Sequence, residues 1–345
     1  MTRIGIDARL LRAFGMGTYV RGLLRGLAEL EGDEEYVVFA AGGDRALVPP
    51  RFECVTADVP PYTIRELVAM ARLATRARLD LLHVPHFVVP CTRLPVVTTL
   101  FDAIPFHHAM PNRRGTPYVA WMMQRAASRA ARVLAISHAA KSDLLEALDL
   151  DRERIVVTHL GVDGRFFHPS EARLPFRYFL FTGRAASHKN LETLLAAFAI
   201  VRRRDPELRL VLAGARHERH AASPGVVVPG FVPDGELPAL YAGAIALIMP
   251  SFMEGFGLPA LEAMAAGTAV ITSTARALVE VTGDAALHVD PRSPHALADA
   301  MERVGSDGEL RAMLIAKGRE RARGFTWRRC AEETRSVYRA VASRA

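Results

Sequence analysis

The chain has 345 residues, half of them apolar, and a formal net charge of +7. This length predicts two domains of ordinary size with a core in each, which excludes a disordered or fibrous protein. Cys54, Cys91 and Cys330 lie far apart and form no C-x-x-C arrangement, so neither a disulfide framework nor a zinc site is expected. The chain start does not resemble a signal peptide and no apolar run is long enough to span a membrane, so we expect a soluble cytoplasmic protein.

Strands and helices alternate through the first half of the chain. Strands are expected at 3–7, 37–40, 54–57, 81–84, 96–100, 133–136 and 155–158. Helical spacing of apolar residues predicts helices after the Gly15-Met16-Gly17 loop, at 64–78, at 118–131 and from a Ser137 cap to about 148. Such alternation predicts a mostly parallel sheet covered by helices on both faces.

A second alternation follows a connection at 161–175 that is marked by Asp163, Gly164, Pro169 and Pro175. Strands are expected at 179–182, 208–213, 226–228, 244–249, 268–272 and 287–289. Helices are expected after an Asn190 cap, at 234–242, from about Pro259 and through the rest of the chain. Two successive α/β units predict two Rossmann-like, doubly wound domains that face each other across a cleft.

The stretch 249–272 carries two carboxylates at a predicted strand–loop–helix junction. Glu254 lies in a loop with Gly255 and Gly257, and Glu262 lies in the following helix. Such a junction directs backbone N–H groups and the positive end of a helix dipole to one place, which favours an anion. Two acids beside an anion site suggest a ligand that also has hydroxyl groups, as a nucleotide sugar has.

Two cations follow the first strand of the second unit, in Gly183-Arg184 and at Lys189. Arginine can bind a phosphate through two hydrogen bonds and lysine can act as a point charge, so both could hold a diphosphate. A solvated surface pair is the alternative. The Gly15–Gly17 loop departs from G-x-G-x-x-G because Val20 replaces the third glycine. Its backbone could approach the diphosphate from the first domain, or it could be a structural turn.

The first domain carries three further polar candidates near predicted strand ends. Asp102 could contact an acceptor or act as a base, or could cap a turn before Pro105. His83 and His86 could reach the acceptor side, although lone histidines are often structural. The D-x-D sequence at Asp149–Asp151 is better explained by turn and capping chemistry than by a metal site, and no metal is expected.

The positive charge admits two explanations. Many arginines alternate with alanine on predicted helices, without the aromatic residues of a single-strand binder, so nucleic acid is not an expected partner. A basic segment could instead rest on an anionic membrane. It contains Arg113, Arg114, Trp121, Met122, Met123, Arg125, Arg129 and Arg132. An apolar face packed into the core with exposed arginines is the alternative.

Five motifs together resemble those of a known family. They are G-M-G-T-Y at 15–19, A-I-S-H-A-A-K-S-D-L at 135–144, H-L-G-V-D at 159–163, G-R-x-x-x-x-K-N at 183–190 and E-G-F-G-L-P-A-L-E at 254–262. The chain thereby resembles the retaining GT-B glycosyltransferases of the "glycosyl transferases group 1" family, especially bacterial mannosyltransferases of O-antigen and exopolysaccharide synthesis. This implies an acceptor-binding domain at 1–168, a donor-binding domain at 169–326, and a last helix within 327–345 that returns to the first domain.

The resemblance also assigns roles to the donor residues. Arg184 and Lys189, beside Gly183, would hold the diphosphate, Glu254 would contact hydroxyls of the transferred sugar, and Glu262 would bind the ribose. The backbone of Gly255, Phe256, Gly257 and Leu258 would line the phosphates, approached by Gly15 and Gly17 of the first domain. Phe101 stands where many relatives have a histidine, which leaves Asp102 as the nearest candidate for the proton acceptor.

We therefore expect a retaining hexosyltransferase that uses GDP-mannose as co-substrate, with no cofactor and no metal. Its acceptor would be a glycan or lipid-linked hydroxyl in bacterial surface polysaccharide synthesis, with peripheral contact to the inner face of the membrane. A UDP-sugar-dependent transferase or a nucleotide-sugar epimerase is the alternative among enzymes. A non-enzymatic nucleotide-binding or nucleic-acid-binding protein is suggested only by the charge.

Overall fold

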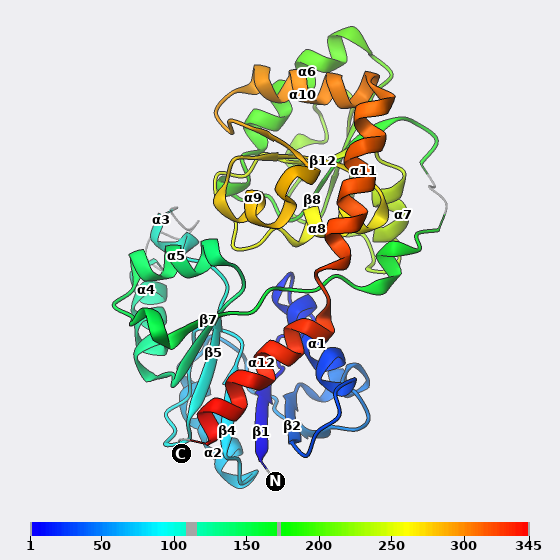
Figure 1. Ribbon diagram of the computed structural model, residues 1–345. Helices are drawn as coiled ribbons and strands as arrows, with labels where there is room; N and C mark the ends of the chain where they lie inside the picture. The colour runs from blue at the N-terminus through cyan, green and yellow to red at the C-terminus, as the bar shows by residue number, and fades with distance from the viewer. Residues whose placement is uncertain (1, 108–115, 171–173, 344–345) are drawn as a thin grey trace. The chain divides into compact units, whose positions relative to one another are not determined.

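The computed structural model describes residues 2–107, 116–170 and 174–343. The chain divides into two compact units, Met1–Gly161 with Phe325–Ala345 and Val162–Gly324 (Figure 1). The boundaries expected from the sequence were 168/169 and 326/327. Each unit is a parallel α/β sheet with helices on both faces, as predicted.

The first unit contains a seven-stranded parallel sheet of order β3-β2-β1-β4-β5-β6-β7. Its strands are β1 (Arg3–Asp7), β2 (Glu35–Ala40), β3 (Glu53–Thr56), β4 (Leu81–Val84), β5 (Val96–Leu100), β6 (Arg132–Ala135) and β7 (Ile155–Val157). Both β4 and β5 are buried at every position, which is typical of strands covered on both faces.

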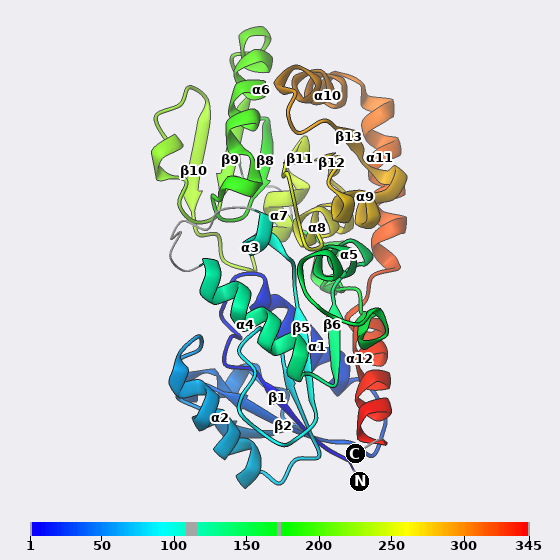
Figure 2. The same cartoon turned by 90° about the vertical axis from the view of Figure 1, so that its left-hand side faces the viewer.

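The helices of the first unit are α1 (Met16–Ala28), α2 (Ile64–Arg76), α3 (Ile104–His107), α4 (Thr116–Arg129), α5 (His138–Ala147) and α12 (Trp327–Ala342). The described residues of this unit also contain the short 3₁₀ turns η1 (Gly42–Leu47) and η2 (Arg152–Arg154). Helices α1 and α12 lie on one face of the sheet, and α2 and α4 on the other (Figure 2). The Ser137 cap is confirmed, because its Oγ accepts a hydrogen bond from Ala140 N at 2.9 Å.

Helix α12 packs along α1 through small residues. A side chain at Gly22 would collide with the indole of Trp327, and one at Gly26 would collide with the backbone of the same residue. The two glycines therefore allow a close approach that fastens the last helix of the chain to the first.

The second unit contains a six-stranded parallel sheet of order β10-β9-β8-β11-β12-β13. Its strands are β8 (Tyr178–Thr182), β9 (Arg209–Ala213), β10 (Val226–Gly230), β11 (Ala246–Met249), β12 (Ala269–Ser273) and β13 (Leu287–Val289). Its helices are α6 (Leu191–Arg204), α7 (Leu237–Ala242), α8 (Leu258–Ala266), α9 (Arg276–Thr282), α10 (Pro294–Ser306) and α11 (Gly308–Arg323). Short 3₁₀ turns are η3 (Gly164–Phe167), η4 (Ser187–Lys189), η5 (Glu218–His220) and η6 (Gly283–Ala285).

The strand order of the second sheet reverses between β8 and β11. In open parallel sheets, ligands bind outside the carboxyl ends of the strands at such a switch point. The loops that follow β8 and β11 carry Lys189 and Glu254, so the topology brings these two sequence-distant segments together. No helix within the described residues is both long and apolar enough to cross a membrane.

Candidate functional site

Lys189 and Glu254 form an ion pair at the switch point of the second unit. The Nζ of Lys189 lies 2.6 Å from Oε1 and 2.8 Å from Oε2 of Glu254, and Ser251 Oγ donates to Oε1 at 2.7 Å. Glu254 is only 8% exposed. The sequence predicted separate tasks for these residues, whereas in the structure the two charges neutralise each other. Because an ammonium has three N–H donors, one remains for a ligand.

Asn190 ties the two loops together. It occupies the N-cap position of α6 in a left-handed conformation with φ of 55°, and its side chain makes no cap hydrogen bond. Its Nδ2 instead donates to Pro250 O at 3.0 Å and to Pro291 O at 2.6 Å. Asn190 therefore occupies the expected N-cap position, but its side chain does not cap the helix. Asn190 fixes the Lys189 loop against the loop that carries Glu254.

Arg184 is the exposed cation of this region. It follows Gly183, whose φ of 132° favours glycine, and whose N–H donates to Ala213 O at 2.9 Å. Within the part of the chain that the structure describes, Arg184 has no hydrogen-bond or ion-pair partner. Its guanidinium is therefore free to bind an anion.

Glu262 is held by a hydrogen-bonded chain of three side chains. Tyr241 OH of α7 donates to Glu262 Oε2 of α8 at 2.9 Å, and Tyr241 OH lies 2.9 Å from Thr182 Oγ1 at the end of β8. Burial raises the pKa of Glu262 to about 7, and it raises the pKa of Tyr241 well above its usual value. Glu262 therefore changes charge near neutral pH while one of its oxygens is held in place.

The start of α8 has the geometry of an anion site. Gly257 is its N-cap with φ of 103°, Pro259 follows in the first turn, and no side chain caps the helix. Gly255 and Phe256 are buried, and Leu258 is the first helical residue. The unfilled cap leaves the helix terminus for a ligand or water, since the end of a helix needs partners for its N–H groups.

Three charged residues act on Glu262 that the sequence did not assign to the site: Arg165, Asp163 and Asp234. Arg165 in η3 lies within 3.9 Å of Asp163 and 4.0 Å of Asp234, and its guanidinium stands 5.3 Å from the centre of the Phe166 ring. Arg165 opposes the rise in the pKa of Glu262, whereas the two aspartates add to it. The motif H-L-G-V-D ends at Asp163, but the segment after it was interpreted only as a connection.

Gly15 and Gly17 have reasons within the first unit for being glycine. Gly15 is the N-cap of α1 with φ of 67°, and Gly17 lies inside the first helical turn. A side chain at Gly17 would collide with the carbonyl of Leu11, and its N–H already donates to Ala13 O at 2.8 Å. The structural alternative for Gly17 therefore accounts for it, and its N–H is not available to a phosphate.

His83 is a core residue, and its expected position on the acceptor side is wrong. It is fully buried, with Nδ1 at 2.6 Å from Tyr338 OH of α12 and Nε2 at 2.8 Å from Thr99 Oγ1. Burial lowers the pKa of His83 to about 3, so the ring is neutral. Both ring nitrogens are engaged, and none is left for a substrate.

His86 is also buried, within a network of charges at the switch point of the first sheet. Its Nδ1 accepts from Val88 N at 3.1 Å, so Nε2 carries the proton and faces Asp7 Oδ2 at 3.1 Å. Arg9 Nη2 lies 2.6 Å from both Asp7 and Glu66. The expectation that His86 reaches the acceptor is therefore wrong.

This network could also be mistaken for a metal site, because Asp7, Glu66 and His86 lie within ligand distance of one another. The guanidinium of Arg9 already supplies the cation between the two acids. Burial by itself raises the pKa of Asp7, but hydrogen bonds from His86 and Arg9 outweigh it and hold the pKa below its usual range. The network is therefore a cluster of buried charges that are paired and hydrogen-bonded with one another.

Asp102 is half-buried after β5, and its Oδ1 accepts from Ile104 N at 2.9 Å. This is the turn-capping geometry named as the alternative, and it occupies one carboxylate oxygen. Phe101 packs edge-on against Tyr19, with ring centres 5.3 Å apart. Asp102 lies at the carboxyl end of the sheet, where a ligand of the first unit would bind.

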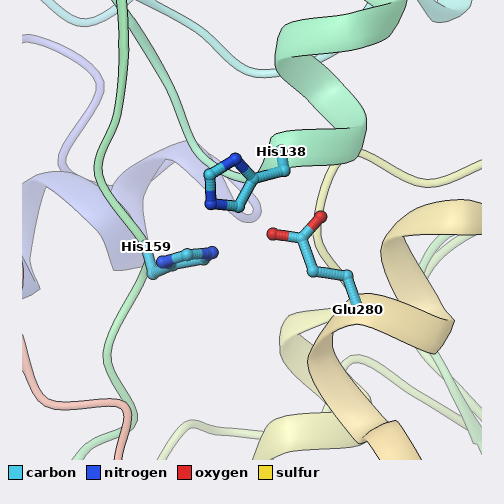
Figure 3. A group of neighbouring side chains, drawn as sticks. All are labelled: His138, His159 and Glu280. Carbon is cyan, nitrogen blue, oxygen red and sulfur yellow. The ribbon is translucent and has the colours of Figure 1, made fainter.

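Two further histidines lie at the same edge of the first sheet. His138 begins α5, His159 follows β7, and their ring centres are 5.5 Å apart (Figure 3). His159 also packs edge-on against Phe325, at 5.8 Å. His138 is exposed and His159 is half-buried. Their positions directly after strand ends are the signal that could have identified them.

The basic segment divides into core and surface. Met122 and Met123 are buried, whereas Tyr118 and Trp121 are exposed with ring centres 6.5 Å apart. Arg125 donates to Val89 O at 2.6 Å and is therefore engaged within the unit. Arg129 is exposed, and Arg132 donates to Ala131 O. Arg113 and Arg114 lie outside the described residues.

Comparisons with known proteins agree with this geometry. Residues 165–321 match the model of "Glycosyl transferases group 1", and residues 14–165 match that of "Glycosyltransferase Family 4". Sucrose-phosphate synthase from Thermosynechococcus elongatus has the same fold, with a TM-score of 0.82 at 21% identity over the whole of both chains. Anabaena Alr3699/HepE in complex with UDP-glucose aligns with a TM-score of 0.76 at 16% identity, over 99% of this chain and 100% of that one. The fold is therefore GT-B, and the two family models show that the chain is a glycosyltransferase.

The curated relatives make the assignment more specific. The chain is 31% identical over 285 residues to O-antigen chain mannosyltransferase B of Escherichia coli, which covers 74% of this chain and 73% of that protein. It spans between 50% and 60% of the length of seven further curated relatives. This chain belongs to the glycosyl transferases group 1 family, and it is a glycosyltransferase. The non-enzymatic alternative is thereby excluded.

Proposed function

We propose that this enzyme transfers mannose from GDP-mannose, with retention of anomeric configuration, to a hydroxyl group of a glycan or lipid-linked acceptor in bacterial surface polysaccharide synthesis. The observation that carries the choice of sugar is the 31% identity to an O-antigen mannosyltransferase over about three quarters of both chains. A UDP-sugar is the second candidate donor, because a solved protein of the same fold holds UDP-glucose.

The second unit is the donor-binding part in this proposal. Arg184 and the third proton of Lys189 bind the diphosphate, together with the uncapped start of α8 at Gly257. Glu254, held by Lys189 and Ser251, accepts a hydrogen bond from a hydroxyl of the transferred sugar. Glu262 accepts from the ribose through the oxygen that Tyr241 leaves free.

The first unit is the acceptor-binding part. Asp102, which follows β5 at the carboxyl end of the sheet and accepts a hydrogen bond from Ile104 N, is our candidate for contact with the acceptor hydroxyl. His138 and His159 replace His83 and His86 as histidines of the acceptor side, because they lie at the carboxyl end of the sheet and are not enclosed by the core.

Retention follows from attack on the face that the leaving group vacates. The bond between the anomeric carbon and the diphosphate oxygen breaks, and the acceptor oxygen bonds to the same face of that carbon. The acceptor proton passes to the departing phosphate oxygen. Positive groups aimed at this diphosphate stabilise the charge that develops on it, and this is usually the largest single contribution to catalysis. Arg184 and Lys189 supply that charge, so we expect turnover to persist in EDTA.

We propose in addition that α4 rests on an anionic membrane at the inner face. Trp121 is 60% exposed, Tyr118 stands beside it, and Arg129 is exposed on the same helix. Exposed aromatic rings and an exposed arginine on one helix suit the boundary between lipid headgroups and acyl chains. A lipid-linked acceptor would be reached from such a position.

A nucleotide panel tests the donor. We expect GDP and GDP-mannose to raise the melting temperature of the purified full chain more than UDP, ADP and UDP-glucose do. Incubation with GDP-mannose in EDTA should then release GDP, and NMR of the product should show the anomeric configuration of the donor. A shift with UDP alone would favour the second candidate. No shift with any nucleotide, together with no donor turnover, would contradict the proposal.

A further inference from the structure

The backbone of Arg216 is held in a conformation that arginine rarely adopts. Its φ is 67°, in the left-handed region, and its side chain is exposed. In this region a side chain crowds the neighbouring carbonyl oxygen, which costs free energy that glycine would not lose. Strain of this kind persists only where the surrounding structure enforces it, and it is frequent at functional sites.

The other non-glycine residues with positive φ in the described chain are Tyr62, Arg78 and Asn190, and each has a local reason. Tyr62 lies just before α2, where its N–H donates to Glu66 Oε2 at 2.6 Å and its ring packs against His86 and Phe87. Arg78 follows Ala77, the C-cap of α2, where a left-handed residue is a usual way to end a helix. Asn190 is of a residue type that tolerates the conformation. Arg216 ends no helix, because it lies in the loop between β9 and η5. Helix termination therefore does not explain it.

The loop that carries Arg216 is bonded to the loop that carries Arg184. Gly183 N donates to Ala213 O at 2.9 Å, and Ala185 N donates to Ala215 O at 3.0 Å. Both bonds continue the pairing with β9 beyond the end of β8, and the second also lies beyond the end of β9. Gly214 packs so closely on Gly183 that a side chain there would collide with the Gly183 carbonyl. Arg184 and Arg216 therefore leave adjacent backbone segments at one edge of the sheet.

His217 fixes the other side of Arg216. It is fully buried, its Nε2 donates to Gly183 O at 2.7 Å, and its ring packs edge-on against Phe181. Ala215 on one side and His217 on the other are thus both attached to the Gly183 segment. This attachment holds Arg216 in its strained conformation, and a shift of the loop would break a buried hydrogen bond.

The positive charge available at the proposed donor site is smaller than the negative charge of a diphosphate, so a second arginine would balance it. A nucleotide-sugar diphosphate carries two negative charges, whereas Lys189, one of the two cations assigned to it, shares its charge with Glu254. Neither Arg184 nor Arg216 has a hydrogen-bond or ion-pair partner among the residues described. We propose that Arg216 is a second cation of the donor-diphosphate site, presented by the loop that His217 anchors to Gly183. This inference rests on the proposed donor site in the second unit.

The test uses a variant that separates strain from charge. Arg216→Gly removes the guanidinium and relieves the backbone, so we expect a higher melting temperature without nucleotide and an affinity for GDP or UDP that is lower by about tenfold or more. Arg78→Gly is the matched control, since it relieves the same backbone region in the first unit. It should raise the melting temperature and leave nucleotide affinity unchanged. Calorimetric titration of the full chain measures both.

Arg184→Ala separates failure of this inference from failure of the proposed function. If Arg184→Ala weakens nucleoside diphosphate binding and Arg216→Gly does not, Arg216 is not part of the site. If neither variant changes the affinity, the donor site itself is wrongly assigned. Arg216→Asn removes the guanidinium without the added backbone freedom of glycine, because asparagine tolerates a positive φ. If the charge is what binds the diphosphate, Arg216→Asn must show the same loss of affinity as Arg216→Gly. Full affinity in Arg216→Asn would overturn the proposal.

Discussion

Replacing Lys189 by alanine removes one partner of a buried ion pair and one cation of the proposed diphosphate site. The Glu254 side chain is 9% exposed and would keep only the hydrogen bond from Ser251. Removing one member of a buried pair costs about 3 to 5 kcal/mol, and we take about 3 because truncation admits water. For a unit of roughly 160 residues this lowers the melting temperature by about 6 to 12 °C.

The loss of stability is too small to explain a large loss of activity. If the stability of the unit is at least about 5 kcal/mol, more than about nine-tenths of the variant stays folded at 25 °C. The loss of a positive group aimed at the leaving diphosphate should instead lower kcat by about 10² to 10³. Steady-state kinetics with saturating donor, together with thermal unfolding of the same preparation, separate the two effects.

The double variant Lys189→Met with Glu254→Gln completes the experiment. It removes both charges and keeps side chains of similar size, so stability should return to within about 1 kcal/mol of the original. Turnover should stay low, because neither the cation nor the carboxylate is restored. Recovery of turnover in the double variant, or a loss in Lys189→Ala no larger than its unfolded fraction, would refute the leaving-group role.

Four further expectations concern other parts of the molecule. Because the pKa of Glu262 is raised to about 7, affinity for GDP-mannose should rise from pH 6 to pH 8, and Glu262→Gln should remove that dependence; a pH-independent affinity of the unaltered chain would contradict the ribose role. The same raised pKa means that the contribution of Glu262 to stability decreases as the pH rises from about 4.5 to 7. His83→Leu should cost about 1 to 3 kcal/mol in denaturant unfolding, since Tyr338 loses its partner, while donor affinity stays unchanged. Replacing Tyr118 and Trp121 by serine should reduce sedimentation with vesicles that contain anionic lipid, whereas Phe231→Ser, at an exposed aromatic residue of the second unit, should not.

The strands, the helices and their division into two sheets could be predicted because each depends on local pattern. Continuous apolar runs such as those of β4 and β11 are typical of strands buried on both faces. The family resemblance, rather than apolar spacing, placed the last helix within 327–345, where α12 lies. The Ser137 cap is another local feature, since a side chain needs only the next turn of backbone to cap a helix.

The polar residues were harder to assign, because burial and partners come from distant parts of the chain. His83 lies 255 residues from Tyr338, so no local pattern distinguishes a core histidine from one that faces a substrate. Arg9 lies between Asp7 and Glu66 only after β1 and α2 have packed. The side chain of Asn190 does not cap α6 for the same reason, because it donates to the carbonyls of two distant prolines instead.

The sequence by itself determined which residues could bind a nucleotide sugar: the cations after β8, the acids around α8 and the glycines between them are signals of residue type and spacing. Only the tertiary structure decided which of these residues are ion-paired, which are protonated near neutral pH and which lie on a strained backbone. It paired Lys189 with Glu254 across 65 residues, and it brought Tyr241 to Glu262. It also attached the Arg216 loop to Gly183. Charge, protonation and strain depend on what surrounds a group and on how far water is excluded from it, and packing creates those surroundings.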